Sequence, residues 1–160
     1  HLTSTKGWTL LQFTSLIPAY TCSTILSMMI YGWAIDRYGT NKLLSLYQVP
    51  MVLSFFLFGV SDSIFVAGLA FVLFGITHGA SSTIPGAFWA ENFGTKHLGS
   101  IKAMATAVSV LGSALGPAIS GILIDFNIPF STQMPFIAVF IIVCCFLNWF
   151  AVKKISRIYH

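Results

Sequence analysis

The side chains that could do chemistry gather in one short polar stretch of an otherwise apolar sequence. This stretch runs from Gly32 to Lys42 and places a carboxylate, Asp36, beside a guanidinium, Arg37, with Gly39 close behind. A charged side chain at the centre of a bilayer costs about 3 kcal/mol or more. We therefore predict a tight charged turn at a membrane surface, between two apolar helices. Glycine tolerates a positive φ, so Gly39 is expected to reverse the chain there.

His78 is the only acid, base or histidine placed deep within an apolar segment. An ionisable residue inside a membrane is a functional candidate, and a histidine can carry a proton or, when charged, bind an anionic substrate. The alternative is a neutral histidine bonded to a neighbouring hydroxyl, such as Thr77 or Ser81. No Asp or Glu lies within the apolar segments. An acid for proton coupling would therefore have to come from outside this sequence.

Enzymatic and metal-dependent chemistry finds little support in the pattern. Cys22, Cys144 and Cys145 lie in apolar runs, and none has metal-ligand spacing with a histidine. An intramembrane enzyme would need paired catalytic groups at depth, and one histidine with scattered serines is not such a set. We expect no enzyme activity, no metal site and no cofactor.

The composition is that of a protein whose solvent is lipid. The 160 residues are 56% hydrophobic and only 8% charged, and the mean hydropathy is +0.86. Soluble domains carry roughly 25% charged residues. The basic residues are few and lie at segment ends, so the pI near 9.1 does not indicate nucleic-acid binding.

Five segments without charges are long enough to cross a membrane, which takes about 20 residues of helix. They are continuous rather than alternating in polarity, which favours helices over strands. The fold class predicted is an all-α, polytopic transmembrane helix bundle, with Pro18 expected to kink the first span. The predicted spans are approximately residues 9–33, 43–60, 64–90, 101–124 and 134–152.

The basic residues also predict an orientation. If the loop carrying Arg37 and Lys42 is cytoplasmic, seven of the eight Lys and Arg fall on that side, and only Lys6 lies opposite. The start is then outside and the C-terminus cytoplasmic. Carriers are often built from repeated groups of helices. An odd number of spans without an initiating Met therefore suggests a fragment that lacks an upstream helix.

Two motifs carry a family resemblance. Gly32-x-x-x-Asp36-Arg37-x-Gly39-x-x-Lys42 resembles the signature loop of the major facilitator superfamily of transporters, found after the second and often the eighth helix. It departs at Thr40 and Asn41, where basic residues are usual, as in a degraded second copy. Two helices later, the run from Gly112 to Gly121 resembles the G-x-x-x-G-P-x-x-G region of the fifth or eleventh helix, with its last glycine one residue late.

The link at residues 93–100 is similar to the loop before the eleventh helix in bacterial monocarboxylate-type porters. The resemblance covers nearly the whole chain and implies helices eight to twelve, in the C-terminal half of a carrier. It implies alternating-access transport of a small solute in a bacterial inner membrane, with the N-terminal half of the same transporter and membrane lipid as partners. The rival interpretation is a small, non-transporting five-helix protein that acts as a subunit or assembly partner.

The resemblance also implies roles for single residues. We predict an ion pair between Arg37 and Glu91, of the kind that latches the two halves in the family; the alternative is a set of interfacial anchors fixed by topology alone. Gly112, Gly116, Pro117 and Gly121 form either a hinge or a tight packing surface. A third set could line a central cavity or merely join helices, namely Gln12, Tyr20, Tyr31, Gln48, Thr83 and Asn148.

Overall fold

The computed structural model describes residue 11, residues 14–60 and residues 63–159, and within them it contains helices and no strand. The predicted all-α fold class is confirmed. The helices are α3 (Ile17–Tyr38), α4 (Thr40–Leu46), α5 (Val49–Val60), α6 (Ile64–Phe93), α7 (Leu98–Asp125) and α8 (Phe130–Tyr159).

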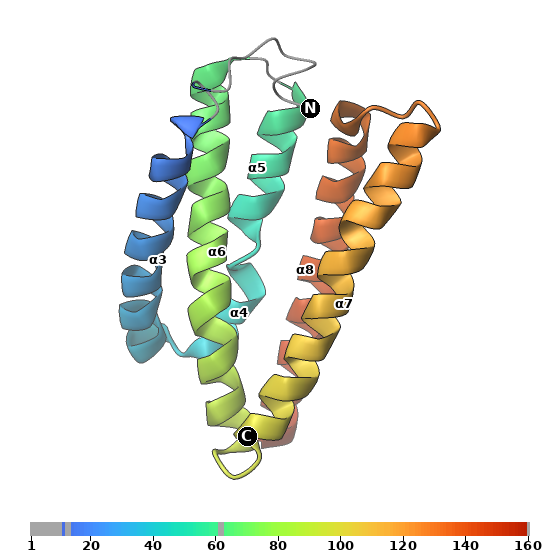
Figure 1. The fold of residues 1–160 in the computed structure, drawn as a ribbon. Helices are drawn as coiled ribbons and strands as arrows, with labels where there is room; N and C mark the ends of the chain where they lie inside the picture. Colours follow the sequence, from blue (N-terminus) through green and yellow to red (C-terminus); the bar gives the residue numbers. More distant parts are fainter. Residues whose placement is uncertain (1–10, 12–13, 61–62, 160) are drawn as a thin grey trace.

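The helices fall into a packed group and one helix that stands apart. α6 lies between α3 and α5, and α8 packs along α4 and α5, whereas α7 makes its main contacts with α6 and α8, and those are sparse (Figure 1). No residue of α7 is buried, although the helix is strongly apolar. The core forms where α4, α6 and α8 meet, around Leu44, Ile84, Phe88 and Val152.

The closest helix contact joins α3 and α6, and two glycines of α6 permit it. A Cβ atom on Gly75 would lie 2.0 Å from Ser23 Oγ, and one on Gly79 would lie 2.5 Å from the backbone oxygen of Thr24. Small residues let helix backbones approach in a membrane, where burial from water does not drive association. Ser27 Oγ adds an interhelical hydrogen bond to the backbone oxygen of Ile76, at 2.7 Å.

The second predicted span is interrupted in the structure. α4 ends at Leu46 and α5 begins at Val49, because Pro50 has no N–H to bond the Leu46 carbonyl. At the break, Gln48 Oε1 accepts hydrogen bonds from Asn148 Nδ2 at 3.4 Å and Cys145 Sγ at 3.5 Å, both on α8. A polar side chain inside an apolar bundle needs hydrogen-bond partners of this kind, because lipid offers none. The break is thereby joined to α8.

Four helical segments of the described chain are long and apolar enough to cross a membrane. They are Thr40–Val60, which is α4 with α5, then Ile64–Phe93, Leu98–Asp125 and Thr132–Lys154. These segments extend beyond the predicted spans, because charge-free stretches mark only the part of a helix that lies in hydrocarbon.

α3 is long enough to cross a membrane but is not among these four segments, because its Ser and Thr residues lower its mean hydropathy. The predicted first span begins at residue 9, outside the described residues, so five spans stay a prediction. The structure places Pro18 in the first turn of α3, directly after a two-residue turn at residues 15–16 that separates α3 from the helical residue 14. Residues 12–13 lie outside the described part of the chain, so a kink at Pro18 within one continuous span stays a prediction. No hydrogen bond is lost in the first turn, since its N–H groups have no partner within the helix.

Candidate functional site

The charged turn between α3 and α4 is as tight as the sequence predicts. Gly39 is the only residue between the two helices. Its φ is +76°, and its N–H donates to the Ile35 oxygen at 2.9 Å. A side chain would be strained at this φ, which explains the glycine. Around Gly32, in contrast, a Cβ atom would meet nothing within 4 Å.

The predicted ion pair between Arg37 and Glu91 is wrong for this structure. The guanidinium carbon of Arg37 lies 5.4 Å from the centre of the Trp33 ring and 5.9 Å from that of Tyr38. Cation–π contact therefore holds Arg37 on the outer surface of α3. Glu91 instead accepts a hydrogen bond from the hydroxyl of Thr40. Thr40 is 0% exposed, and a buried hydroxyl needs a partner.

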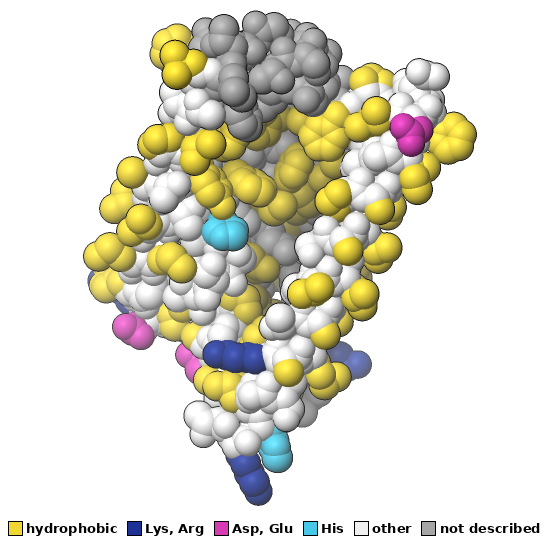
Figure 2. All heavy atoms as spheres, viewed as in Figure 1, with side chains coloured by type: hydrophobic (Ala, Val, Ile, Leu, Met, Phe, Trp, Pro, Cys, Tyr) yellow, Lys and Arg dark blue, Asp and Glu magenta, His cyan; other side chains and the backbone are white. Residues whose placement is uncertain are grey.

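Asp36 and Lys42 are both exposed, on either side of Gly39. Figure 2 shows the Lys and Arg side chains of the visible face gathered toward the lower end of the molecule, where the hydrophobic side chains thin out. Figure 1 places the link between α6 and α7 and the end of α8 at the same end. This charge distribution is that of a helix bundle whose lower end meets water.

α6 carries a stripe of side chains that α3 does not cover. Ser81 and Ser82 lie three and four residues after His78, Pro85 lies four and three residues after these serines, and Trp89 follows four residues later, which places the five side chains on one helix face. The first three are exposed. The sequence holds this spacing, and a search for polar residues at helical period would have found the stripe.

The imidazole of His78 has no hydrogen-bond partner among the described residues. The Ser81 hydroxyl donates to the backbone oxygen of His78 at 2.8 Å, and the Thr77 hydroxyl donates to that of Leu73 at 3.3 Å. The alternative in which either hydroxyl holds a neutral imidazole is therefore wrong for this structure. The His78 ring lies 5.9 Å from the Tyr20 ring, which leaves its nitrogens available to a ligand.

The α6 stripe borders a polar hollow. A cavity of about 480 Å³ opens between α4, α6, α7 and α8, and its polar side chains are Tyr47, Ser81, Trp89, Ser109 and Asn148. No acidic or basic side chain lines it. About one turn from Ala105 and two turns from Ser109 along α7, Lys102 reaches toward α6. Its ammonium nitrogen lies 3.8 Å from the place where a Cβ of Gly86 would be.

Only some of the residues predicted to line a cavity lie at the polar hollow. Asn148 lines the hollow, and Gln48 joins it by the hydrogen bond already described. The Thr83 hydroxyl bonds back to the Gly79 oxygen at 3.1 Å, and Tyr31 packs against the core. Gln12 lies outside the described residues. Tyr47, Ser81 and Ser109 were missed, because the side chains that meet here come from three helices.

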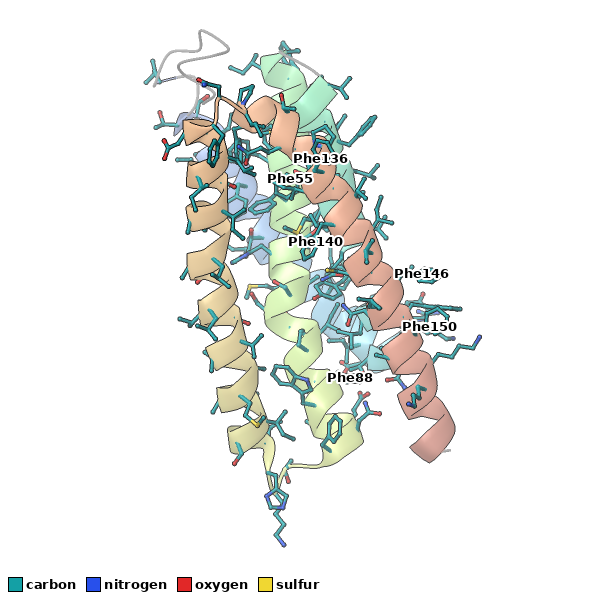
Figure 3. All side chains as sticks on the ribbon, turned by 90° about the vertical axis from the view of Figure 1, so that its right-hand side faces the viewer. Phe55, Phe88, Phe136, Phe140, Phe146 and Phe150 are labelled. Atoms are coloured by element: carbon teal, nitrogen blue, oxygen red, sulfur yellow. The ribbon has the colours of Figure 1, made fainter. Side chains whose placement is uncertain are left out.

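The glycines of α7 are not packed against other helices of the described chain. A Cβ on Gly112, Gly116 or Gly121 would meet nothing within 4 Å, so tight packing is not seen there. Gly116, Pro117 and Gly121 instead line an apolar cavity of about 1060 Å³. Figure 3 shows Phe55, Phe136 and Phe140, also lining residues, near one end of α8. α7 continues through Pro117 as one helix, and a hinge there stays a prediction.

Comparison with known proteins gives one match. A family model described as Major Facilitator Superfamily matches residues 1–157. No curated protein and no solved structure matches the chain. The match spans both motifs, the polar hollow and the helices described above, except for the last two residues of α8.

Proposed function

Because the chain belongs to the Major Facilitator Superfamily, a family of membrane transporters, we propose that it forms part of a secondary carrier for a small organic anion. The observation that carries this proposal is the polar hollow between α4, α6, α7 and α8. Hydroxyl, amide and indole groups converge there within a bundle whose surface is otherwise apolar. Small-molecule sites have this character, with a few polar groups in an apolar setting.

The charges around the hollow favour an anion. Its lining contains no carboxylate. Two basic side chains lie on the helices that form it, namely His78, which is exposed on the same face of α6 as Ser81, and Lys102 of α7. A protonated imidazole and an ammonium attract a carboxylate. The resemblance of the link at residues 93–100 to that of monocarboxylate-type porters supports a small monocarboxylate as the solute.

His78 also supplies a route for proton coupling. Since no acid lies in the spans of this chain, the imidazole is the group that can take up a proton at membrane depth. Once protonated, it pairs with the carboxylate of the solute, so that proton and anion cross together.

We further propose that this chain supplies helices eight to twelve and that an N-terminal half completes the carrier. The support comes from α7, whose 18-residue apolar window is 0% buried. One face of α7 carries small residues, among them Ser109, Gly112 and Gly116, and such faces favour helix contacts in membranes. The partner half would cover this face and close the hollow, and the two halves would alternate access around it.

The basic residues at one end support the orientation. A cytoplasmic position for the end that carries Arg37, Lys42 and Lys102 follows the positive-inside rule, and we propose a bacterial inner membrane. A five-helix subunit remains the rival. Tagging the C-terminus of the native product and measuring its mass separates the two. A product with a mass near 17.5 kDa would favour the subunit. A product with the larger mass of a protein made of two six-helix halves would favour the carrier.

Replacing His78 by alanine is expected to lower monocarboxylate uptake by at least about tenfold, which corresponds to about 1.4 kcal/mol of lost interaction. Uptake of labelled acetate, lactate and pyruvate would be measured in membrane vesicles that contain the native gene product. The matched control is His97→Ala, because His97 is exposed at the start of α7, outside the hollow. Normal uptake by His78→Ala, or no uptake of any monocarboxylate by the unaltered protein, would contradict the proposal.

A further inference from the structure

A second concave site lies at the charged end of the molecule, and it shares only Val152 with the lining of the polar hollow. It is a groove of about 370 Å³ between α4 and α8, which we call the lysine groove, and it is lined by Asn41, Lys42, Ser45, Leu46, Trp149, Val152 and Lys153. Neither the charged turn nor the transport proposal uses this groove as a site. Its two basic side chains come from helices that are about a hundred residues apart in sequence.

The two lysines of the groove are available to an anion. Lys42 and Lys153 are both exposed. The ammonium nitrogen of Lys153 lies 4.8 Å from the centre of the Trp149 ring, a contact that holds it at the rim of the groove. Within the described part of the chain, no carboxylate pairs with either lysine, since Glu91 is engaged by Thr40. The groove therefore keeps its positive charge.

The walls of the groove are apolar on the side that faces the membrane. Leu46 is 64% exposed and Trp149 is 41% exposed. Each lies about one turn from its lysine, away from the charged end of the molecule: Leu46 follows Lys42 toward α5, and Trp149 precedes Lys153 on α8. Beyond Trp149, Phe146 and Phe150 project outward together from α8 (Figure 3), with their ring centres 5.2 Å apart. The surface thus changes from basic to aromatic and aliphatic along the direction into the bilayer.

The Asn41 side chain adds a polar group to the same groove. Its Oδ1 atom is buried and has no hydrogen-bond partner. An unpartnered buried acceptor costs free energy. A rotation of the Asn41 side chain toward the groove would let this oxygen accept from a hydroxyl or ammonium donor of a bound molecule. The groove therefore offers two cations, one acceptor and an apolar wall, all at the level where helices leave the membrane.

We propose that the lysine groove binds an anionic phospholipid. The phosphate lies between the ammonium groups of Lys42 and Lys153, a headgroup donor faces Asn41, and an acyl chain follows Leu46, Trp149 and the outer phenylalanines. Basic pockets between transmembrane helices recognise lipid headgroups in this way. A free phosphate would use the lysines but not the apolar wall, and a zwitterionic lipid would bring its own cation against them. This proposal does not depend on which solute the carrier transports.

The test is native mass spectrometry of the full gene product, purified in detergent and titrated with phosphatidylglycerol or phosphatidylcholine. Unaltered protein is expected to retain phosphatidylglycerol at least about tenfold better than phosphatidylcholine, given two lysine contacts. Lys42→Gln with Lys153→Gln should abolish this preference, and Lys42→Arg with Lys153→Arg should keep it. The matched control is Lys96→Gln with Lys154→Gln, which removes the same charge outside the groove.

Three results would overturn the proposal. The control pair could lose as much phosphatidylglycerol as the groove pair, which would indicate diffuse surface charge. Phosphatidylcholine could bind equally well. Millimolar inorganic phosphate could displace the lipid, which would indicate a site for free anions. Size-exclusion profiles of all the variants would establish that each is folded, so that loss of lipid reports on the groove itself.

Discussion

Gly79→Ala is expected to destabilise the protein by about 1–3 kcal/mol or more, the range for overpacking a closely packed site. The added Cβ would lie 2.5 Å from the backbone oxygen of Thr24 and 2.8 Å from Ser27 Cβ. The first of these atoms belongs to the α3 backbone and cannot rotate away, so α3 and α6 must separate. This separation would also lengthen the hydrogen bond from Ser27 to Ile76. Thermal unfolding in detergent, followed by size-exclusion fluorescence, measures the loss.

The matched control is Gly32→Ala, on α3. It makes the same chemical change within a helix, but a Cβ there meets nothing within 4 Å. Alanine favours a helix interior over glycine by about 1 kcal/mol, so this variant is expected to be as stable as the unaltered protein or more so. If Gly79→Ala and Gly32→Ala unfold at the same temperature, the close contact between α3 and α6 is not important for stability.

Glu91→Ala is expected to cost about 1–3 kcal/mol, because it leaves the hydroxyl of Thr40 buried without a partner. Thr40 is 0% exposed and donates to the Glu91 carboxylate. The carboxylate also favours the start of α4, where unpaired N–H groups carry partial positive charge. Thr40→Val should cost less, because Glu91 is exposed and water can take the place of the hydroxyl. The same unfolding measurement gives both values.

A double-mutant cycle distinguishes this pairing from the one expected from the signature loop. The effects of Thr40→Val and Glu91→Ala should be less than additive, since either change removes the same bond. The exchange Arg37→Glu with Glu91→Arg should restore nothing, because Arg37 contacts Trp33 and Tyr38 instead. Recovery of stability or transport by this exchange would contradict the structure and would support the ion pair between Arg37 and Glu91.

Much of the fold could be predicted from the distribution of charge. Membrane crossing requires long charge-free stretches, so the gaps between charges locate α6, α7 and α8 to within a few residues at their apolar parts. The turn at Gly39 was equally predictable, because glycine adopts a positive φ without strain and the structure uses that φ to join α3 to α4. These features depend on local sequence and on the bilayer, and both are known before any tertiary contact is.

Contacts between helices were harder to predict. Gly75 and Gly79 have the same four-residue spacing as Gly112 and Gly116, yet only the first pair touches a neighbouring helix. The spacing shows that a close approach is possible, and the position of a second helix decides whether it occurs. The break before Pro50 was overlooked for a related reason. The sequence stays apolar across the break, so hydropathy does not reveal it. The residues that bond to Gln48 at the break, Cys145 and Asn148, are about a hundred residues away in sequence.

The contact between α3 and α6 also sets where the polar stripe of α6 points. Turning α6 about its own axis by one residue, about 100°, would replace Gly79 with His78 or Ala80 against the α3 backbone, where even a single Cβ has no space. Gly75 and Gly79 therefore fix the rotation of α6 about its own axis relative to α3. His78 can be carried with α3 as a rigid pair, but it cannot swivel away from α3 by itself. Any change in its exposure during a working cycle must come from movement of the helices that face the pair.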